Sequence, residues 1–355
     1  MSGIFYILVG NNGATYIFNA KSLRSINYSL RFYKARNLKQ ALKKILLGVF
    51  LFIASCLPKL HQKHRFRTID DVGCRLASIV GEGIPFELDD ECSVLISSTG
   101  DKVIVHHHGE YFQKYATGTS LSKVHGEVEI YSYLDKRFAN FSVSKLYDSY
   151  EEEAYCCFKL SSIPRYINRS IPKEDVLVLA LTELFCVVPG KNCYLAEYVD
   201  SLGGNLSNLD DPAMHTLQRI LVQVANMYRG FKIPLGLVHG DFKPWNINNK
   251  KDFLIYDFEE AVTEGAPLED LLNYFVDPLI RYISAKRVAN HVFQRSRVKL
   301  YDSYLQRMNL DIDFRALLYI YLVGRVVFWS SRDEPEVAQK YADLANYVFS
   351  THGLQ

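Results

Sequence analysis

The chain has 355 residues, 48% of them hydrophobic, a formal net charge of +2 and a mean hydropathy near zero. This length accommodates one large or two modest domains with a full core, and the composition excludes a largely disordered protein. Seven cysteines without a Cys-x-x-Cys pair argue against a disulfide framework and favour a reducing, cytoplasmic setting.

The charges are distributed unevenly along the chain. Residues 1–67 contain twelve Lys and Arg and no Asp or Glu, whereas the remaining residues carry 29 basic and 39 acidic side chains. A split of this size predicts a basic extension, residues 1–67, attached to an acidic domain. Within it, the apolar runs Ile4–Val9 and Ala14–Phe18 flank Gly10-Asn-Asn-Gly13 and predict a β-hairpin, because Asn and Gly tolerate positive φ.

A basic stretch with helical character follows, from Leu23 to Lys44, and leads into the apolar run Ile45–Leu57, which ends at Pro58. As a helix, these thirteen apolar residues reach about 20 Å, whereas the hydrocarbon core of a bilayer is roughly 30 Å thick. We therefore expect no simple transmembrane span. Two interpretations stay open: the segment packs on the domain, or it lies in the interface of an anionic membrane, which makes the protein peripheral at an inner membrane face.

Three short strands with polar turns are predicted after residue 91: Ser93–Ser97, Lys102–His107 and Glu110–Ala116. Ser98-Thr-Gly-Asp101 forms the first turn, and we expect the run His106–His108 to be a solvated strand end. Lys114 alternates with Phe112 and Ala116 on one strand face, an unusual place for a single charge. Such a lysine either extends to solvent from an edge strand or is buried and needs a charged partner.

The partner for Lys114 is expected on Ser122–Lys136, which has the periodicity of a helix. Its apolar stripe consists of Val124, Val128, Tyr131 and Leu134. Glu127 lies beside this stripe, whereas Glu129 lies nearly opposite it. We therefore predict an ion pair between Lys114 and Glu127 and a solvated Glu129.

The most informative sequence is Leu237-Val-His-Gly-Asp-Phe-Lys-Pro-Trp-Asn-Ile247, followed by Phe253-Leu-Ile-Tyr-Asp-Phe-Glu259. Each part begins with a short apolar strand that leads directly into acidic and amide groups. Asp241, Asn246 and Asp257 offer the oxygen ligands that Mg²⁺ prefers, together with one carboxylate that is left over as a base. Lys243 adds a positive charge where a transferring phosphoryl group needs one.

These motifs resemble the catalytic and metal-binding loops of the protein-kinase-like superfamily. His239-Gly-Asp-Phe together with Asp257-Phe-Glu is most similar to the aminoglycoside phosphotransferase and choline kinase branch. The resemblance covers roughly residues 92–275. It implies an α+β bilobal fold, with a small antiparallel N-lobe over 68–198 and a mainly helical C-lobe over 199–355.

The resemblance also implies a role for each matching residue in ATP- and Mg²⁺-dependent phosphoryl transfer. Asp241 would be the catalytic base, Lys243 would stabilise charge on the γ-phosphoryl group, and Asn246 and Asp257 would hold Mg²⁺. Lys114, fixed by Glu127, would bind the α- and β-phosphates.

Three further segments have counterparts in this family. The turn Ser98-Thr99-Gly100 would be the nucleotide loop. Tyr194–Val199 resembles the hinge strand between the lobes, whose backbone at Glu197, Tyr198 and Val199 would pair with the adenine edge. Asp270 would either brace the catalytic loop or simply cap the helix that follows Pro267.

The predicted acceptor is a hydroxyl group of a small molecule such as a sugar, an aminoglycoside, a choline-like compound or an envelope saccharide, and no nucleic-acid partner is expected. Two other classes stay open. A protein kinase is one, because Lys243-Pro resembles the corresponding motif there, although only about ten residues separate Asp257 from Pro267. The other is a non-catalytic kinase-like scaffold. Nucleotide binding with and without Mg²⁺ distinguishes these classes.

Overall fold

The computed structural model describes residues 4–10, 13–30, 38–56, 66–80, 84, 86–162, 172–188, 190–207, 214–249 and 253–354. The chain divides into two compact units. The first, here called the sheet unit, comprises Met1–Asp135 and Ser144–Tyr166, and the second, the helical unit, comprises Lys136–Val143 and Ile167–Gln355.

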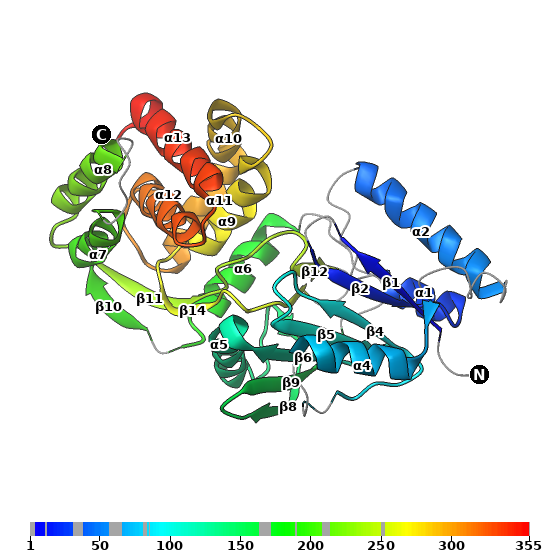
Figure 1. The fold of residues 1–355 in the computed structure, drawn as a ribbon. Coiled ribbons are helices and arrows are strands. Elements are labelled where there is room, and N and C mark those ends of the chain that lie inside the picture. The colour runs from blue at the N-terminus through cyan, green and yellow to red at the C-terminus, as the bar shows by residue number, and fades with distance from the viewer. Residues whose placement is uncertain are drawn as a thin grey trace. The chain divides into compact units, whose positions relative to one another are not determined.

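The sheet unit is built on one eight-stranded sheet with the order β3-β1-β2-β4-β5-β6-β9-β8, in which every neighbouring pair is antiparallel (Figure 1). Its strands are β1 (Phe5–Val9), β2 (Thr15–Asn19), β3 (Phe66–Arg67), β4 (Cys92–Ile96), β5 (Lys102–His107), β6 (Tyr111–Thr117), β8 (Leu146–Glu151) and β9 (Tyr155–Ser161). Its helices are α1 (Leu23–Ser29), α2 (Leu38–Cys56), α4 (Ile69–Val80), the 3₁₀ turn η1 (Gly118–Ser120) and α5 (Leu121–Tyr133).

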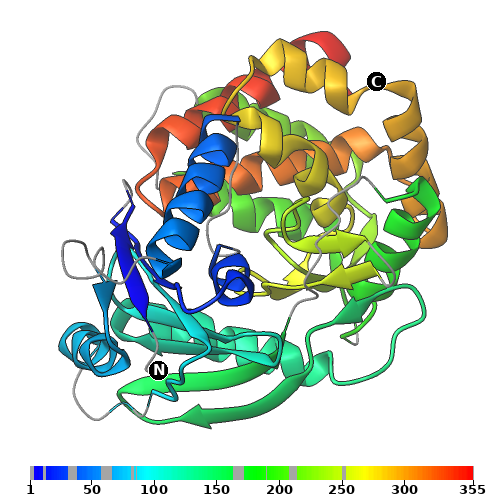
Figure 2. The same ribbon diagram turned by 90° about the vertical axis from the view of Figure 1, so that its right-hand side faces the viewer.

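Side-chain alternation along the strands divides the helices between the two faces of this sheet. Tyr115 of β6 and Ile17 of β2 are buried in one cluster with Val72 and Leu76 of α4. The neighbouring residue Phe18 faces the other way and packs with α1 and α2. Lys114 likewise points away from Tyr115, toward α5, so α4 covers one face while α1, α2 and α5 cover the other (Figure 2).

The helical unit contains two small sheets, β10-β11-β14 and β12-β13-β7. Their strands are β7 (Ser142–Val143), β10 (Lys191–Tyr194), β11 (Lys232–Val238), β12 (Ile247–Asn249), β13 (Phe253–Ile255) and β14 (Val262–Gly265). The helices of this unit are α6 (Glu174–Phe185), α7 (Leu195–Ser207), α8 (Met214–Met227), α9 (Glu269–Ile280), α10 (Ala285–Val292), α11 (Arg295–Arg307), α12 (Phe314–Ser330) and α13 (Pro335–His352).

The predicted α+β class, an antiparallel sheet unit followed by a mainly helical unit, is confirmed. The strands predicted after residue 91 differ from β4, β5 and β6 by at most one residue at each end. The largely buried helix α12 begins where the Asp313 side chain accepts a hydrogen bond from the Arg315 backbone N–H at 2.8 Å.

The predicted hinge strand Tyr194–Val199 is wrong. β10 ends at Tyr194, and Glu197, Tyr198 and Val199 lie in the first turns of α7. Leu195, Val199 and Leu206 are all buried, and spacings of four and seven place them on one helix face. The division between the units also differs from the predicted one, because it falls after Tyr166 and not after Tyr198.

Residues 1–67 do not form a separate extension, because β2 pairs with β4 from Thr15 opposite Ile96 to Ile17 opposite Val94. The predicted hairpin is present as β1 and β2. No helix among the described residues is long and apolar enough to cross a bilayer. The three histidines expected at a solvated strand end, His106–His108, are instead buried, because α1 and the loop before β4 cover them.

Candidate active site

In the sheet unit, Lys114 is buried and forms the predicted ion pair with Glu127. The Lys114 Nζ atom lies 2.9 Å from Oε1 and 2.8 Å from Oε2 of Glu127, and the two residues are 7% and 1% exposed. β6 supplies the lysine and α5 supplies the glutamate. Because a buried charge is costly without a partner, this two-oxygen contact fixes the ammonium group in one place. An extended, solvated lysine is thereby excluded.

The turn between β4 and β5 is held together by one carboxylate. Asp101 accepts hydrogen bonds from the hydroxyl groups of Ser97, at 3.1 Å, and of Thr99 and Thr119. Burial by itself raises the pKa of Asp101, but these hydrogen bonds outweigh it and lower the pKa to about 2. Gly100 adopts a φ of +81° at the tip of the turn. The predicted nucleotide loop is therefore an ordered turn.

In the helical unit, the loop after β11 is fixed by the side chains of α9. Asp270 accepts backbone hydrogen bonds from His239 at 2.8 Å and from Gly240 at 3.1 Å. Asn273, one turn later, donates to the Gly240 carbonyl at 2.9 Å. Burial raises the pKa of Asp270 to about 8, although the two backbone hydrogen bonds work in the opposite direction. Asp270 thus braces the loop, as the resemblance implied, and does not merely cap a helix.

Gly240 is required by the geometry of this loop. Its φ is +72°, and a Cβ atom at this position would lie 2.1 Å from the carbonyl oxygen of Glu260. A side chain is therefore excluded both by backbone conformation and by contact with neighbouring backbone. The tight turn brings the next residue, Asp241, out of the core.

Both carboxylate oxygens of Asp241 are held by neighbouring side chains. Asn246 donates from Nδ2 to Asp241 Oδ2 and to the Asp241 carbonyl, each at 2.9 Å. Lys243 forms an ion pair with the other oxygen, Oδ1. The Asp241 side chain nevertheless remains 27% exposed, whereas that of Lys243 is only 9% exposed. Asp241 is therefore an oriented carboxylate that a substrate can reach.

Lys243 is shared between two carboxylates. Its Nζ atom also lies 2.7 Å from Oδ2 of Asp277, which in turn contacts Arg325 at 3.2 Å and accepts a hydrogen bond from the Tyr341 hydroxyl at 2.6 Å. Burial of Asp277 favours its neutral form, but Lys243 and Arg325 outweigh this effect and lower its pKa. A continuous chain of charges thus runs from Arg325 to the candidate base.

Asn246 and Asp257 come to the same end of the hairpin formed by β12 and β13. Ile247 pairs with Ile255, and the Tyr256 N–H donates to the Asn246 carbonyl at 3.2 Å, so Asp257 lies one residue beyond this pair. Asp257 has a φ of +74°, a strained value for a non-glycine residue that is found preferentially at functional sites.

The free side of the Asn246 amide fits a cation ligand. Its Nδ2 atom must face the Asp241 oxygens, both of which are acceptors, so the orientation of the amide is determined. The opposite atom, Oδ1, is buried and accepts no hydrogen bond from the described residues. A buried amide oxygen of this kind, together with the Asp257 carboxylate, is the donor set that Mg²⁺ prefers.

His239 connects the two segments that carry these residues. Its Nε2 atom lies 3.1 Å from the Tyr256 carbonyl and its Nδ1 atom lies 3.3 Å from the Asp241 backbone nitrogen. A carbonyl only accepts, so Nε2 carries the proton and Nδ1 accepts from the Asp241 N–H. Burial lowers the pKa of His239, which keeps the ring in this neutral form.

The structure therefore assembles most of the predicted site residues in two groups, one in each unit. Glu197, Tyr198 and Val199 join neither group, because they lie on α7. The sequence analysis missed Asp277 and Arg325. Asp277 follows Asp270 by seven residues and so shares its helix face, and Arg325 is a single charge within an apolar helix; both signals were present in the sequence.

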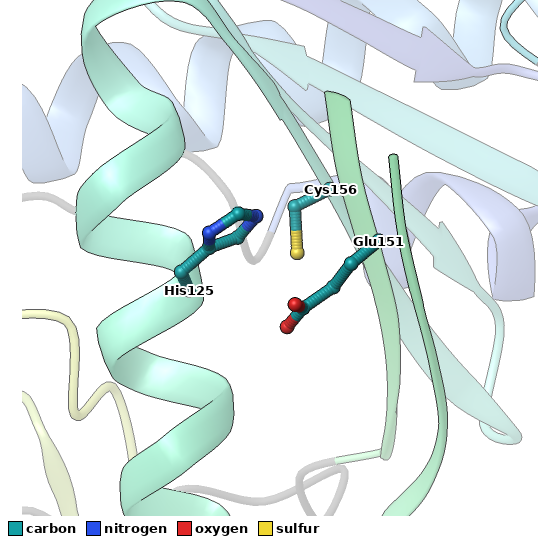
Figure 3. Close-up of side chains that lie close together, drawn as sticks. All are labelled: His125, Glu151 and Cys156. Atoms are coloured by element: carbon teal, nitrogen blue, oxygen red, sulfur yellow. The ribbon is translucent and has the colours of Figure 1, made fainter. Parts of the chain in front are cut away.

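A second cluster, remote in sequence from the catalytic motifs, joins three side chains of metal-binding type (Figure 3). The donor atoms of His125, Glu151 and Cys156 all lie within 4.8 Å of one another. Glu151 and Cys156 are directly opposite each other on β8 and β9, so strand pairing alone accounts for two of the three. Burial raises the pKa of the Cys156 thiol to about 12, which disfavours the thiolate that a metal requires. This cluster has no part in the chemistry that follows.

No protein-family model matches the chain, and no curated protein matches it. Solved structures that it resembles include a GDP complex of an aminoglycoside 2′-phosphotransferase, with 11% identity over 72% of this chain and 91% of that chain and a TM-score of 0.47. A choline/ethanolamine kinase family protein from Mesorhizobium loti matches with 14% identity over 80% and 95% and a TM-score of 0.44. An aminoglycoside phosphotransferase from Streptomyces rimosus matches with 13% identity over 78% and 98% and a TM-score of 0.38.

Proposed function

We propose that this protein is an ATP- and Mg²⁺-dependent phosphotransferase that phosphorylates a hydroxyl group of a small molecule or saccharide. The observation that carries the proposal is the pair Asp241 and Asn246. A partly exposed carboxylate is held by an amide whose other atom, a buried oxygen, accepts no hydrogen bond from the part of the chain that the structure describes. One short loop thus supplies both a base and a ligand for a hard cation.

Each residue of the site then has a defined task. Asp241 orients the acceptor hydroxyl and takes its proton, a contribution of about 10²–10⁴ in rate. Lys243 fixes the Asp241 carboxylate and offsets negative charge that develops beside it. In the sheet unit, Lys114 binds the α- and β-phosphates of ATP and the Glu127 carboxylate positions its ammonium group.

Asn246 and Asp257 would hold Mg²⁺, which neutralises charge on the phosphate groups when it is bound. The remaining contribution of these two residues is positional. Asp257, whose backbone is strained, lies at the same end of the β12–β13 hairpin as Asn246. His239 maintains the connection between the two segments.

A protein substrate is less compatible with the segment between Asp257 and α9. β14 occupies residues Val262–Gly265 of this short interval and pairs with β11. A regulated activation loop needs a longer, separate segment. A small acceptor is therefore favoured over a protein kinase.

The test measures ATP consumption with a panel of acceptors that includes choline, an aminoglycoside, simple sugars and an envelope saccharide. With the acceptor that supports turnover, Asp241→Asn should lower kcat at least about 100-fold, because the base is lost while the shape is retained. Asp257→Ala should bind ATP without the tightening that Mg²⁺ gives the wild type, as measured by titration calorimetry. Asp200→Asn, an exposed carboxylate on α7, is the matched control and should leave both measurements unchanged.

Three results would contradict the proposal. Turnover of Asp241→Asn within tenfold of wild type removes Asp241 as the base. Full Mg²⁺ dependence of ATP affinity in Asp257→Ala removes the metal site. Failure of the wild type to bind ATP in the presence of Mg²⁺ leaves a non-catalytic scaffold.

A further inference from the structure

Helix α2 buries one face in the sheet unit and leaves a second face uncovered. Leu51 and Ala54 are fully buried among Phe18 and Ile26, and the Phe50 ring packs on Tyr6 with centroids 5.3 Å apart. These contacts hold the helix against β1, β2 and α1 (Figure 1). The helix is thus a fixed part of its unit, and its exposed residues have a defined direction.

The uncovered face of α2 is almost entirely apolar. We call it the α2 apolar face; it consists of Leu42, Ile45, Leu46, Val49, Phe52 and Ile53, each of which is between 41% and 63% exposed. Their spacing of three and four residues places all six on one stripe. Single exposed apolar residues are ordinary, but a contiguous stripe of this size marks an interaction surface.

An open groove runs between this face and α1. Its volume is about 870 Å³, and its lining combines apolar side chains of both helices with two cations, Arg24 and Lys44. Leu23 at its edge is 62% exposed. An apolar floor with cations at its edge suits a ligand that has a hydrocarbon part and a negatively charged part.

The charged side chains of α1 and α2 have only one sign. Residues 1–67 contain no Asp or Glu, and Lys43 lies exposed on α2 itself. A second copy of this chain would therefore bring positive charge against positive charge at the same face. An anionic surface would be attracted by the lysines while it covers the apolar stripe.

We propose that the α2 apolar face docks on an anionic phospholipid bilayer. The helix lies in the plane of the interface, with its apolar stripe toward the acyl chains and its lysines at the headgroups. It does not cross the bilayer, in agreement with the absence of a spanning helix among the described residues. The proposal goes beyond the proposed function and does not depend on it.

The experiment is co-sedimentation of the full-length protein with vesicles, either of neutral phosphatidylcholine or of phosphatidylcholine with one third phosphatidylglycerol. Wild type should bind the anionic vesicles at least tenfold more tightly than the neutral ones, and binding should weaken as salt is raised. The double variant Ile45→Ser and Val49→Ser should lose at least tenfold in partition to anionic vesicles. Val222→Ser is the matched control, because Val222 is a similarly exposed apolar residue on α8, at 59%.

Because the substituted side chains are exposed, the variants should keep the melting temperature of wild type, which is measured in parallel. The proposal is overturned if wild type does not sediment with anionic vesicles, or if the double variant binds as wild type does. It is also overturned if wild type is a dimer in solution that the double variant converts to a monomer, since the face then belongs to a second copy. The proposal is likewise overturned if wild type, but not the double variant, captures an acidic protein in the absence of vesicles, since the face then binds a protein partner.

Discussion

His239 shows how one side chain can align two segments of the candidate active site. Its neutral ring donates to the carbonyl that precedes Asp257 and accepts from the backbone N–H of Asp241. A protonated ring would present a second N–H to the Asp241 N–H, and the two donors would repel each other. The fully buried position opposes this charge and lowers the pKa of His239. The alignment of the site is therefore linked to a neutral histidine.

This linkage predicts a specific pH dependence of stability. Because the pKa of His239 is lowered in the folded protein, the folded state binds fewer protons than the unfolded state. The contribution of His239 to folding stability is therefore complete above its ordinary pKa of 6.5 and is lost as the pH falls below that value. Between pH 7 and pH 5.5, wild type should lose more unfolding free energy than His239→Gln, by at most about 1.4 kcal/mol. Urea unfolding at the two pH values measures the difference. An imidazole NMR signal that titrates near 6.5 in the folded protein would contradict it.

At the residue scale, the sequence was most informative where a charge conflicted with its apolar surroundings. The position of Lys114 on an apolar strand face and that of Glu127 beside an apolar helix stripe were sufficient to predict their ion pair. The ion pairs that Asp277 forms with Lys243 and with Arg325 were not predicted, because they join elements that are remote in sequence. Periodicity places Asp277 on the same helix face as Asp270, but it does not identify a partner on another element.

At the scale of elements, one helix determines the shape of the loop that carries Asp241. One face of α9 carries Asp270, Asn273 and Asp277. Asp270 accepts from the backbone N–H groups of His239 and Gly240, and Asn273 donates to the Gly240 carbonyl. Asp277 forms an ion pair with Lys243. Leu268, the residue before α9, has a φ of +73°, a strained value that starts the helix with this face toward the loop.

Arg325 of α12 completes this arrangement, and its removal should be severe. It contacts both Asp277 and the Gly240 carbonyl and is only 4% exposed. Arg325→Met leaves a buried carboxylate with one cation fewer and should lower the free energy of unfolding by about 3–5 kcal/mol. Urea unfolding provides the measurement.

The matched comparison for Arg325 is an exposed ion pair. Lys191 lies 3.6 Å from Glu264, and their side chains are 68% and 61% exposed. Lys191→Met should cost less than about 1 kcal/mol, because solvent screens such a pair. Equal effects of the two substitutions would show that the buried chain of charges adds nothing to stability.

The hinge prediction failed at the same scale for a physical reason. Tyr194–Val199 is a short apolar run, and periodicity over so few residues does not separate a strand from the start of a helix. The helix continues to Ser207, and the buried Leu206 near its end lies on the same face as Leu195 and Val199.

At the scale of the whole molecule, composition predicted a division that strand pairing overrides. The charge asymmetry of residues 1–67 is real, but β2 is hydrogen-bonded to β4 and continues the sheet. Asn19 donates to the carbonyls of Asp90 and Cys92 at 2.8 and 3.2 Å, and Ser29 contacts Ser93 at 2.6 Å. Pairing between strands so distant in sequence cannot be derived from composition.

A shortened chain that begins at Thr68 should therefore be defective. It would leave β4 as an exposed edge strand that pairs only with β5, and it would uncover Ser93 and the His106 ring; such edges promote aggregation. We expect this shortened protein to elute from a size-exclusion column mainly as aggregate, whereas the full chain elutes as a discrete species. A soluble shortened protein with an unchanged melting temperature would show that β1 and β2 are dispensable.

The pairing of β2 with β4 also has a consequence for synthesis of the protein on the ribosome. Asn19 and its partner Cys92 are separated by 73 positions, which take about 4 to 15 s to translate. During this interval the first hairpin has no β4 to pair with. The nascent helix α2 then exposes both the face that is later buried and the α2 apolar face. A membrane surface or a chaperone that binds apolar helices can therefore contact α2 before the rest of the chain is synthesised. The first contacts of α2 are thus formed before the sheet is complete.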